Sequence, residues 1–297
     1  MKRNLWRLAL MIVVVLLIFA LYRRLTINPP SPTAFTEADR PLTIAHRGSM
    51  VLAPENTLLA LQGALDLGAD AIEVDVRASA DGHLVVIRDE TVDRTTEGSG
   101  NVSALTLAEL QALDAGYRYS PDGGMTFPYR GQGEQIPTLR EVLTKFPDAR
   151  VAIRIRQTTP PIEEMTAALI AELNAQSRVL VIAADDQTIH RFRQRAPEVA
   201  TAASDDEIRS FYAWQRWGLG SLYRPVAHAL VVPDQWGDVQ LITAGFVAAA
   251  QAQGMKVYVE TIDTPGRMRE LLALSVDGIV TNRPDLMRQV MAELGYH

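Results

Sequence analysis

The chain contains no cysteine among its 297 residues. It can therefore form no disulfide framework, no thiolate metal site and no cysteine nucleophile, so any bound metal must be held by Asp, Glu or His. It also lacks an excess of basic charge, because 29 Lys and Arg residues stand against 35 Asp and Glu residues. A general nucleic-acid surface needs clustered Lys and Arg, so we expect no nucleic-acid partner.

The composition also excludes intrinsic disorder. With 47% hydrophobic and 22% charged residues, the chain must bury a sizeable core. Its length is compatible with two domains of about 150 residues each, or with one α/β barrel of about 250 residues.

A single long apolar run lies near the N-terminus. Residues 8–22, LALMIVVVLLIFALY, are flanked by the basic residues Lys2, Arg3, Arg7, Arg23 and Arg24. As a helix this run would span about 22 Å, and flanking side chains could extend it toward the roughly 30 Å hydrocarbon core of a membrane. A cleaved signal peptide has a similar run, but two arginines directly after it favour an uncleaved anchor.

We therefore predict three parts in the chain. Residues 1–25 form an N-terminal transmembrane anchor or an uncleaved signal, residues 26–41 form a Pro-rich linker, and residues 42–297 form the folded domain. The distribution of basic residues predicts a single-pass membrane protein with this domain outside the cytoplasm.

Eight β-rich runs alternate with stretches of helical spacing from residue 42 onward. They read LTIAH, DAIEVDV, RVAIRIR, RVLVIAA, VATAA, HALVV, KVYVE and DGIVT. This alternation predicts an α/β fold, a TIM (β/α)8 barrel whose functional groups stand at the C-terminal ends of the strands.

A ninth β-rich run, LVVIR at residues 84–88, follows the second strand too closely for a parallel crossover. It should turn back as an extra antiparallel strand, because Asp81-Gly82 is a typical two-residue type I′ turn. If that turn closes the hairpin, Arg88 lies directly opposite Asp75.

Two strand ends carry residues suited to chemistry. Glu73 and Asp75 alternate with apolar residues, so both carboxylates project from one face of a strand and could hold Mg²⁺ or Ca²⁺, or form structural ion pairs. His46 and Arg47 end the first strand, where His46 can exchange protons and Arg47 can bind a phosphate or carboxylate.

Taken together, the ordered motifs resemble the glycerophosphodiester phosphodiesterase family. The strings are IAHRG, APENT, DAIEVDV, DGHLVVIRDETVDRTT, LTLAEL, IPTLREVL and VDGIVTNRPDLM, spread over residues 42–293. The resemblance implies a TIM barrel that splits glycerophosphodiesters into glycerol 3-phosphate and an alcohol. It also implies two catalytic histidines and a divalent cation, Ca²⁺ or Mg²⁺, held by three carboxylates.

Four roles carry over to matching positions. The resemblance makes His46 the first catalytic histidine, Arg47 a phosphate-binding residue, and Glu73 with Asp75 two of the metal ligands. Three other positions depart from the family pattern, and they are Arg88 in place of the second catalytic histidine, Arg154 in place of the third metal carboxylate, and Glu260 where the family usually has Trp. Arg156 stands at the Lys of the same strand motif.

These departures have physical consequences. Arg88 keeps its proton at physiological pH and cannot act as a general acid and base, which should remove a factor of about 10² to 10⁴ in rate. Arg154 replaces an anionic ligand with a fixed positive charge, so we expect no cation to be bound here. No other histidine, at positions 83, 190, 228 or 297, is a convincing substitute.

The charges of the pocket balance without a metal. The carboxylates Glu55, Glu73, Asp75 and Glu260 match the guanidinium groups of Arg47, Arg88, Arg154 and Arg156. We therefore hypothesise that Arg88 pairs with Asp75 and Arg154 with Glu73, and that these guanidinium groups replace the cation. The sequence leaves open whether Glu260 faces the pocket.

Three functions follow as expectations. The first is a membrane-tethered family member whose hydrolysis is lost or strongly impaired, with Arg47, Arg88 and Arg156 holding a glycerophosphodiester or a phospholipid head group. The alternative is an active divalent-metal-dependent hydrolase. The second alternative is a closed salt-bridge network in an interaction or structural protein.

Overall fold

The computed structural model describes residues 29–237 and 239–296, together with a few positions between 6 and 26. The predicted anchor at residues 1–25 therefore lies largely outside the described residues. Among the residues described, no helix is both long and apolar enough to cross a membrane.

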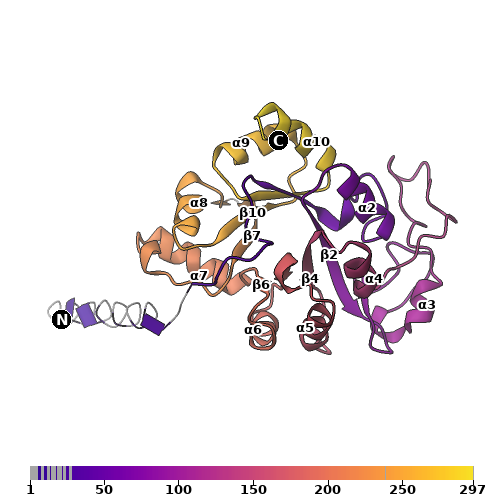
Figure 1. The fold of residues 1–297 in the computed structure, drawn as a ribbon, viewed down its shortest axis with the longest axis horizontal. Coiled ribbons are helices and arrows are strands. Elements are labelled where there is room, and N and C mark those ends of the chain that lie inside the picture. Colours follow the sequence, from indigo (N-terminus) through magenta and orange to yellow (C-terminus); the bar gives the residue numbers. More distant parts are fainter. Residues whose placement is uncertain are drawn as a thin grey trace.

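Eight parallel strands form a nearly closed barrel (Figure 1). Around the barrel they are β1 (Leu42–Ala45), β2 (Ala71–Ala78), β4 (Arg150–Ile155), β5 (Val179–Ile182), β6 (Ala200–Thr201), β7 (Ala229–Pro233), β10 (Lys256–Glu260) and β11 (Gly278–Thr281). Between β6 and β7, the two ends of the hydrogen-bonded strand order, an isolated parallel bridge links Ala202, directly after β6, to Ala229. The predicted TIM barrel and all eight predicted strands are confirmed.

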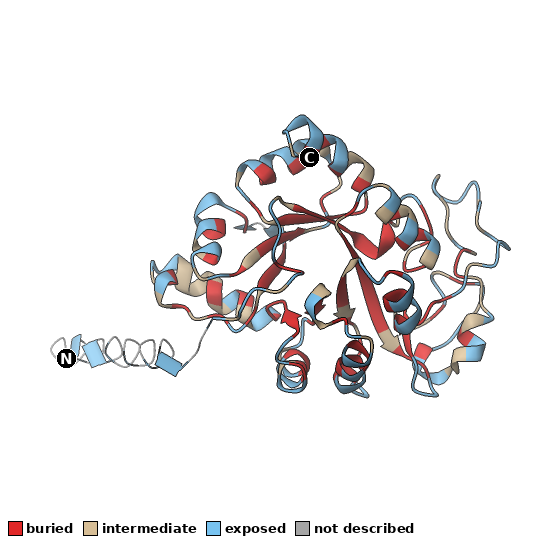
Figure 2. Cartoon of the chain, viewed as in Figure 1, coloured by how far each residue is buried: buried red, intermediate tan, exposed pale blue. Residues whose placement is uncertain are grey.

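Helices surround the barrel, and each buries part of its surface, as Figure 2 shows. They are α2 (Leu58–Asp66), α3 (Leu107–Gln111), α4 (Leu139–Lys145), α5 (Glu163–Glu172), α6 (Asp186–Arg195), α7 (Asp205–Arg216), α8 (Ala244–Gln251), α9 (Pro265–Ala273) and α10 (Pro284–Glu293). Thr106, Thr138 and Ser204 begin their helices with capping boxes, which explains why these helices begin there.

The interior of the barrel is filled by large side chains set against small ones. Tyr258 and Phe35 are fully buried and meet edge to face, with ring centroids 6.2 Å apart. Around them lie inward-facing residues of the strands, among them Ala71, Ala152 and Ala229. The large rings therefore occupy space that the alanines leave free.

Phe35 belongs to the segment predicted as a linker, yet it fills the N-terminal end of the barrel. Its backbone N–H donates to Ser177 O at 2.9 Å, and Arg150 Nε donates to Ala34 O at 2.9 Å. The packed domain therefore begins upstream of the boundary that we expected at residue 42.

The extra antiparallel strand β3 (Leu84–Val86) pairs with β2 as predicted, but its predicted register is wrong by one residue. Val76 lies opposite Val86, because the hairpin has a three-residue loop at 80–82 that ends on Gly82 at a φ of 81°. The backbone N–H of Ile87, not that of Arg88, therefore donates to Asp75 O, at 2.9 Å.

A short hairpin that the sequence did not predict follows β7. It consists of β8 (Gln235–Trp236) and β9 (Val239–Gln240), and it leaves the barrel from the C-terminal end of a strand. It is therefore placed at the end of the barrel where the candidate site lies, which is called the mouth below.

Candidate active site

The turn after β1 places His46 and Arg47 at the mouth of the barrel. Arg47 has a φ of 51° and Gly48 a φ of 76°, so the backbone reverses within two residues. A Cβ at Gly48 would lie 2.6 Å from Leu61 N, which only glycine avoids. Both His46 and Arg47 are buried, and a left-handed arginine is a form of strain that proteins retain at functional sites.

His46 is oriented by two residues from neighbouring strands. Its Nδ1 lies 2.8 Å from Asn282 Oδ1, while Asn282 Nδ2 and backbone N donate to the Asp263 carboxylate at 2.7 and 2.8 Å. Because the Asn282 amide nitrogen already faces a carboxylate, its oxygen must accept, so neutral His46 carries its proton on Nδ1. Nε2 is then the nitrogen that can accept a proton.

Glu73 and Asp75 point into the barrel from β2, and two arginines reach them, Arg154 of β4 and Arg156 directly after that strand. Arg154 Nε donates to Glu73 Oε1 at 3.0 Å, and Arg156 Nε donates to Asp75 Oδ1. The predicted pairing of Arg154 with Glu73 is confirmed. Burial alone would raise the pKa of Asp75, but Arg156 and Arg47 hold that pKa below its ordinary value.

Glu260 also faces the pocket, which the sequence left open. It lies two residues after Tyr258, so it points inward from β10, and it accepts from Arg154 Nη2. One guanidinium group is therefore shared by two carboxylates, Glu73 and Glu260. Burial raises the pKa of Glu260 above its ordinary value, even though Arg154 opposes that shift.

The predicted pairing of Arg88 with Asp75 is wrong. The Arg88 side chain is 45% exposed and donates to Asp89 Oδ1 at 2.8 Å. The one-residue change in the hairpin register moves position 88 beyond the point opposite Asp75, so its side chain does not reach that carboxylate.

Asp75 is instead paired by Arg47, whose Nε lies 2.9 Å from Asp75 Oδ2. Arg47 Nη1 also donates to Glu55 Oε1 at 3.2 Å. Glu55 receives two further hydrogen bonds, of 2.6 and 2.9 Å, from Arg94.

Arg94 also contacts Asp89, so a continuous chain of ion pairs links buried Asp75 to exposed Arg88. Sequence reasoning missed Arg94, because nothing in its loop indicates that it contacts Glu55. If Arg94 is counted instead of Arg88, four guanidinium groups again balance the four carboxylates Glu55, Glu73, Asp75 and Glu260.

These contacts test whether the mouth fits a divalent cation held by three carboxylates. Glu73 and Asp75 are both within hydrogen-bond distance of guanidinium groups, and the third ligand position is Arg154 itself. A cation between Glu73 and Asp75 would have to displace Arg154 or Arg156. The residues present therefore do not fit a divalent cation at this place.

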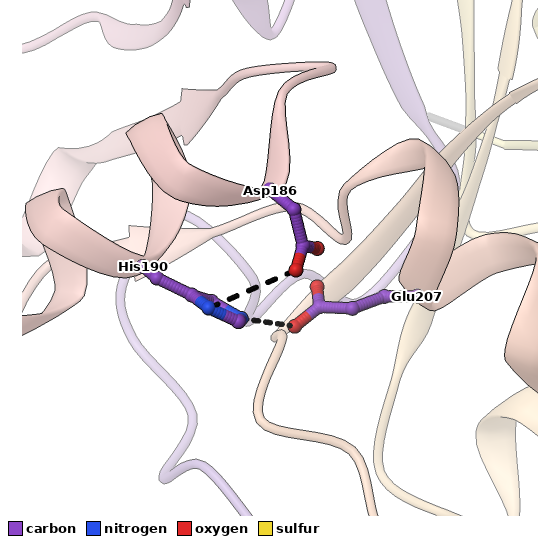
Figure 3. A group of neighbouring side chains, drawn as sticks. All are labelled: Asp186, His190 and Glu207. Atoms are coloured by element: carbon purple, nitrogen blue, oxygen red, sulfur yellow. Dashed lines mark ion pairs between the residues drawn. The ribbon is translucent and has the colours of Figure 1, made fainter.

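Another place where a cation could be considered lies outside the mouth. Among the described residues, Asp186, His190 and Glu207 bring one possible ligand atom each within 4.8 Å of one another (Figure 3). However, both oxygens of Glu207 accept from Arg193, at 2.6 and 2.9 Å. A positive group already occupies this cluster, so we describe it as an ion-pair network between α6 and α7.

Comparison with known proteins matches both the fold and the strand-end motifs. The model of the Glycerophosphoryl diester phosphodiesterase family matches residues 46–286. A glycerophosphodiester phosphodiesterase of Caldanaerobacter subterraneus subsp. tengcongensis is 33% identical over 261 residues, which cover 86% of this chain and 99% of that relative.

Solved structures agree with these matches. A glycerophosphodiester phosphodiesterase from Agrobacterium tumefaciens is similar with a TM-score of 0.70 and 30% identity, covering 84% of this chain and 99% of that one. An Oleispira antarctica phosphodiesterase in complex with the product sn-glycerol-3-phosphate has a TM-score of 0.66 and 26% identity, covering 85% and 97%.

Proposed function

Because the chain belongs to the glycerophosphoryl diester phosphodiesterase family, we propose that it binds phosphodiesters at the barrel mouth without a divalent cation. In this proposal its hydrolytic activity is lost or strongly impaired. The ligand is a glycerophosphodiester or a phospholipid head group, and the structure of the Oleispira antarctica relative, which contains sn-glycerol-3-phosphate, supports that class.

The observation that carries the proposal is the position of Arg154. Its guanidinium group lies between Glu73 and Glu260, where a metal would need a third carboxylate. It also bears a positive charge, because burial would lower the pKa of Arg154 but Glu73 and Glu260 raise it above its ordinary value. Arg154 therefore remains a cation at every physiological pH.

Three groups are available to a bound phosphate. Arg154 and Arg47 supply positive charge, and no hydrogen bond to a described residue uses Arg154 Nη1. His46 Nε2 can donate to a phosphate oxygen when the ring is protonated, since Nδ1 is already bound to Asn282. Bidentate contacts of this kind suit phosphate oxygens.

Calorimetry with the purified 297-residue chain tests the absence of a cation site. We expect no tight binding of Ca²⁺ or Mg²⁺, and salt-sensitive binding of glycerophosphocholine in the presence of a chelator. One tight cation site that disappears in Asp75→Ala would contradict the proposal.

Reversing the substitutions tests the same idea from the other side. The double variant Arg88→His with Arg154→Glu restores the family residues at both positions, and we expect it to gain Ca²⁺ or Mg²⁺ binding together with some release of glycerol 3-phosphate. The single variant Arg88→His is the matched control, because it leaves Arg154 in place and should gain neither.

An active hydrolase is the second candidate function, and the orientation of His46 favours it. A histidine held by Asn282 and Asp263 with Nε2 available is the arrangement of a working proton acceptor. Long incubation with several glycerophosphodiesters plus Ca²⁺ or Mg²⁺ distinguishes the two. Turnover that is lost in His46→Ala would establish the hydrolase and contradict the proposal that hydrolytic activity is lost or strongly impaired.

We also propose that the apolar run at residues 8–22 tethers the chain to a membrane, with the barrel outside the cytoplasm. The support is the length of the run and the basic residues on both sides of it. Membrane fractionation and protease accessibility in intact cells, compared with a chain that begins at Pro29, test this part. Equal recovery of both chains in the soluble fraction would contradict it.

A further inference from the structure

A cavity of about 220 Å³ opens beside Arg154 on the side of the mouth formed by β5, β6 and β7. Resting on the proposed function, we infer that this cavity holds a small, uncharged, apolar substituent of the bound phosphodiester. The phosphate itself would lie at Arg154, Arg47 and His46.

Apolar side chains make up most of the residues that line the cavity, and the charged residues Arg154, Asp205, Arg209 and Glu260 line it as well. Three successive strands and the residues that follow them contribute Ile182 at the end of β5 with Ala183 after it, Ala203 two residues after β6, and Val231 within β7. Ile208 of α7 and Leu241 after the β8–β9 hairpin complete the walls. None of these apolar side chains can hydrogen-bond a hydroxyl or pair with a charge, so a polar group placed against them would lose its water without replacement.

Charged groups lie only at the two ends of the cavity among its described lining residues. Arg154 and Glu260 form its inner end and belong to the ion-pair network of the mouth. Asp205 and Arg209 form its outer end, where the Arg209 guanidinium lies 5.3 Å from the ring centroid of Trp236. A phosphate at Arg154 therefore has its second ester substituent directed along apolar walls toward Trp236.

The contact between Arg209 and Trp236 also disfavours one class of substituent. A quaternary ammonium group would seek an aromatic face, but Arg209 already covers that of Trp236 and is itself a cation. Arg209 therefore competes with a choline-like group for this ring and repels it, although the Asp205 carboxylate at the same end would attract it. The volume of the cavity is below the roughly 300 Å³ of pockets that enclose drug-sized ligands, so a long acyl chain would project into solvent.

Calorimetry with methyl phosphate diesters tests the inference, because a series with a second methyl, ethyl, butyl or octyl group keeps the charge constant. We expect the affinity to rise about fourfold for each methylene buried, up to butyl, and then to change little between butyl and octyl. An equal affinity across the series would overturn the apolar cavity. An affinity that keeps rising to octyl would overturn the inference that the substituent is small. Tighter binding of glycerophosphocholine than of the butyl ester would overturn the inference that it is uncharged.

The same series separates this inference from the proposed function. If no member of the series binds and glycerophosphocholine does not bind either, phosphodiester binding at the mouth is wrong. If all members bind equally, phosphodiester binding stands and only the apolar cavity is wrong.

Two variants locate the effect. Ala203→Leu fills the cavity, and we expect the ratio of butyl to methyl affinity to fall to about one. The matched control Ala273→Leu, on the exposed face of α9, should keep the full ratio. Trp236→Ala opens the outer end without adding bulk to the core and should reduce the ratio about tenfold, so the inference remains testable if Ala203→Leu fails to fold. An unchanged ratio in Trp236→Ala and in folded Ala203→Leu would overturn it.

Discussion

The mouth of this barrel has two halves of opposite chemistry, a charged half and an apolar half. In the half formed by β1, β2, β4, β10 and β11, each buried carboxylate of the pocket contacts a guanidinium group or lies in a hydrogen-bonded chain. In the half formed by β5, β6 and β7, alanine, isoleucine and valine side chains leave a cavity. Buried charge fixes its neighbours in place because each charge needs a partner, whereas small apolar residues leave space.

The largest expected effect comes from breaking the charged half. Asp75→Asn leaves Arg47 and Arg156 without their shared partner, and we expect the free energy of unfolding to fall by about 3–5 kcal/mol. Urea unfolding measures it. Glu172→Gln, in the exposed pair with Arg140, is the matched control and should change the free energy of unfolding far less. Equal losses in the two variants would mean that the buried ion pairs contribute no more to stability than an exposed pair.

The apolar half should tolerate truncation better than the core outside the barrel. Ile153→Ala removes a fully buried side chain and should cost about 4 kcal/mol, whereas Ile182→Ala, beside the existing cavity, should cost about 2 kcal/mol. The difference arises because Ile182 already lacks neighbours on one side. Urea unfolding of both variants checks it, and an equal cost would argue that the cavity is closed in solution.

A smaller effect is expected from the contact between β6 and β7, the two strands that meet in the apolar half. Thr201 N donates to His228 Nδ1 at 3.2 Å, and burial followed by the charge of Arg193 lowers the pKa of His228 to about 4. The unfolded chain therefore binds a proton first as pH falls below 6.5, so stability should decrease between pH 6.5 and pH 4. We expect about 1–2 kcal/mol for this partly exposed ring.

Thermal unfolding across that pH range measures this loss. His228→Asn keeps an acceptor for Thr201 N but cannot take up a proton, so we expect it to flatten the dependence. A variant with the same slope as the original chain would assign the acid sensitivity to another group.

The smallest effect should come from the solvent end of the ion-pair chain. Arg88→Ala removes an exposed side chain whose described partner is Asp89, and Asp89 retains Arg94. We expect a change within about 0.5 kcal/mol by urea unfolding. A loss comparable with that of Asp75→Asn would place Arg88 inside the charged half after all.

Residues whose position depends on strand periodicity could be predicted from the sequence. Glu73 and Asp75 on β2, like Arg154 on β4 and Arg156 directly after it, follow from alternation along an extended segment, and the structure brings all four to the mouth. The same alternation from Tyr258 would have placed Glu260 inside, had the buried tyrosine been recognised as an interior residue.

Residues whose position depends on loop geometry could not be predicted in the same way. Arg88 was misplaced because a three-residue loop, and not a two-residue turn, closes the hairpin before it. Arg94 lies in an irregular loop and reaches Glu55, 39 positions earlier in the chain. No sequence periodicity predicts such a contact, because the contact depends on how two loops meet after the barrel has formed.

Because Phe35 packs into the N-terminal end of the barrel, it determines which end of the barrel would face a support to which the chain is attached. Pro30 to Thr33 lie beside His228, at the starting end of β7 and opposite the mouth. A chain attached through its first residues to a vesicle, a bead or a sensor chip would therefore turn its open pocket toward bulk water. Dissolved small molecules would reach that pocket without passing the attachment layer.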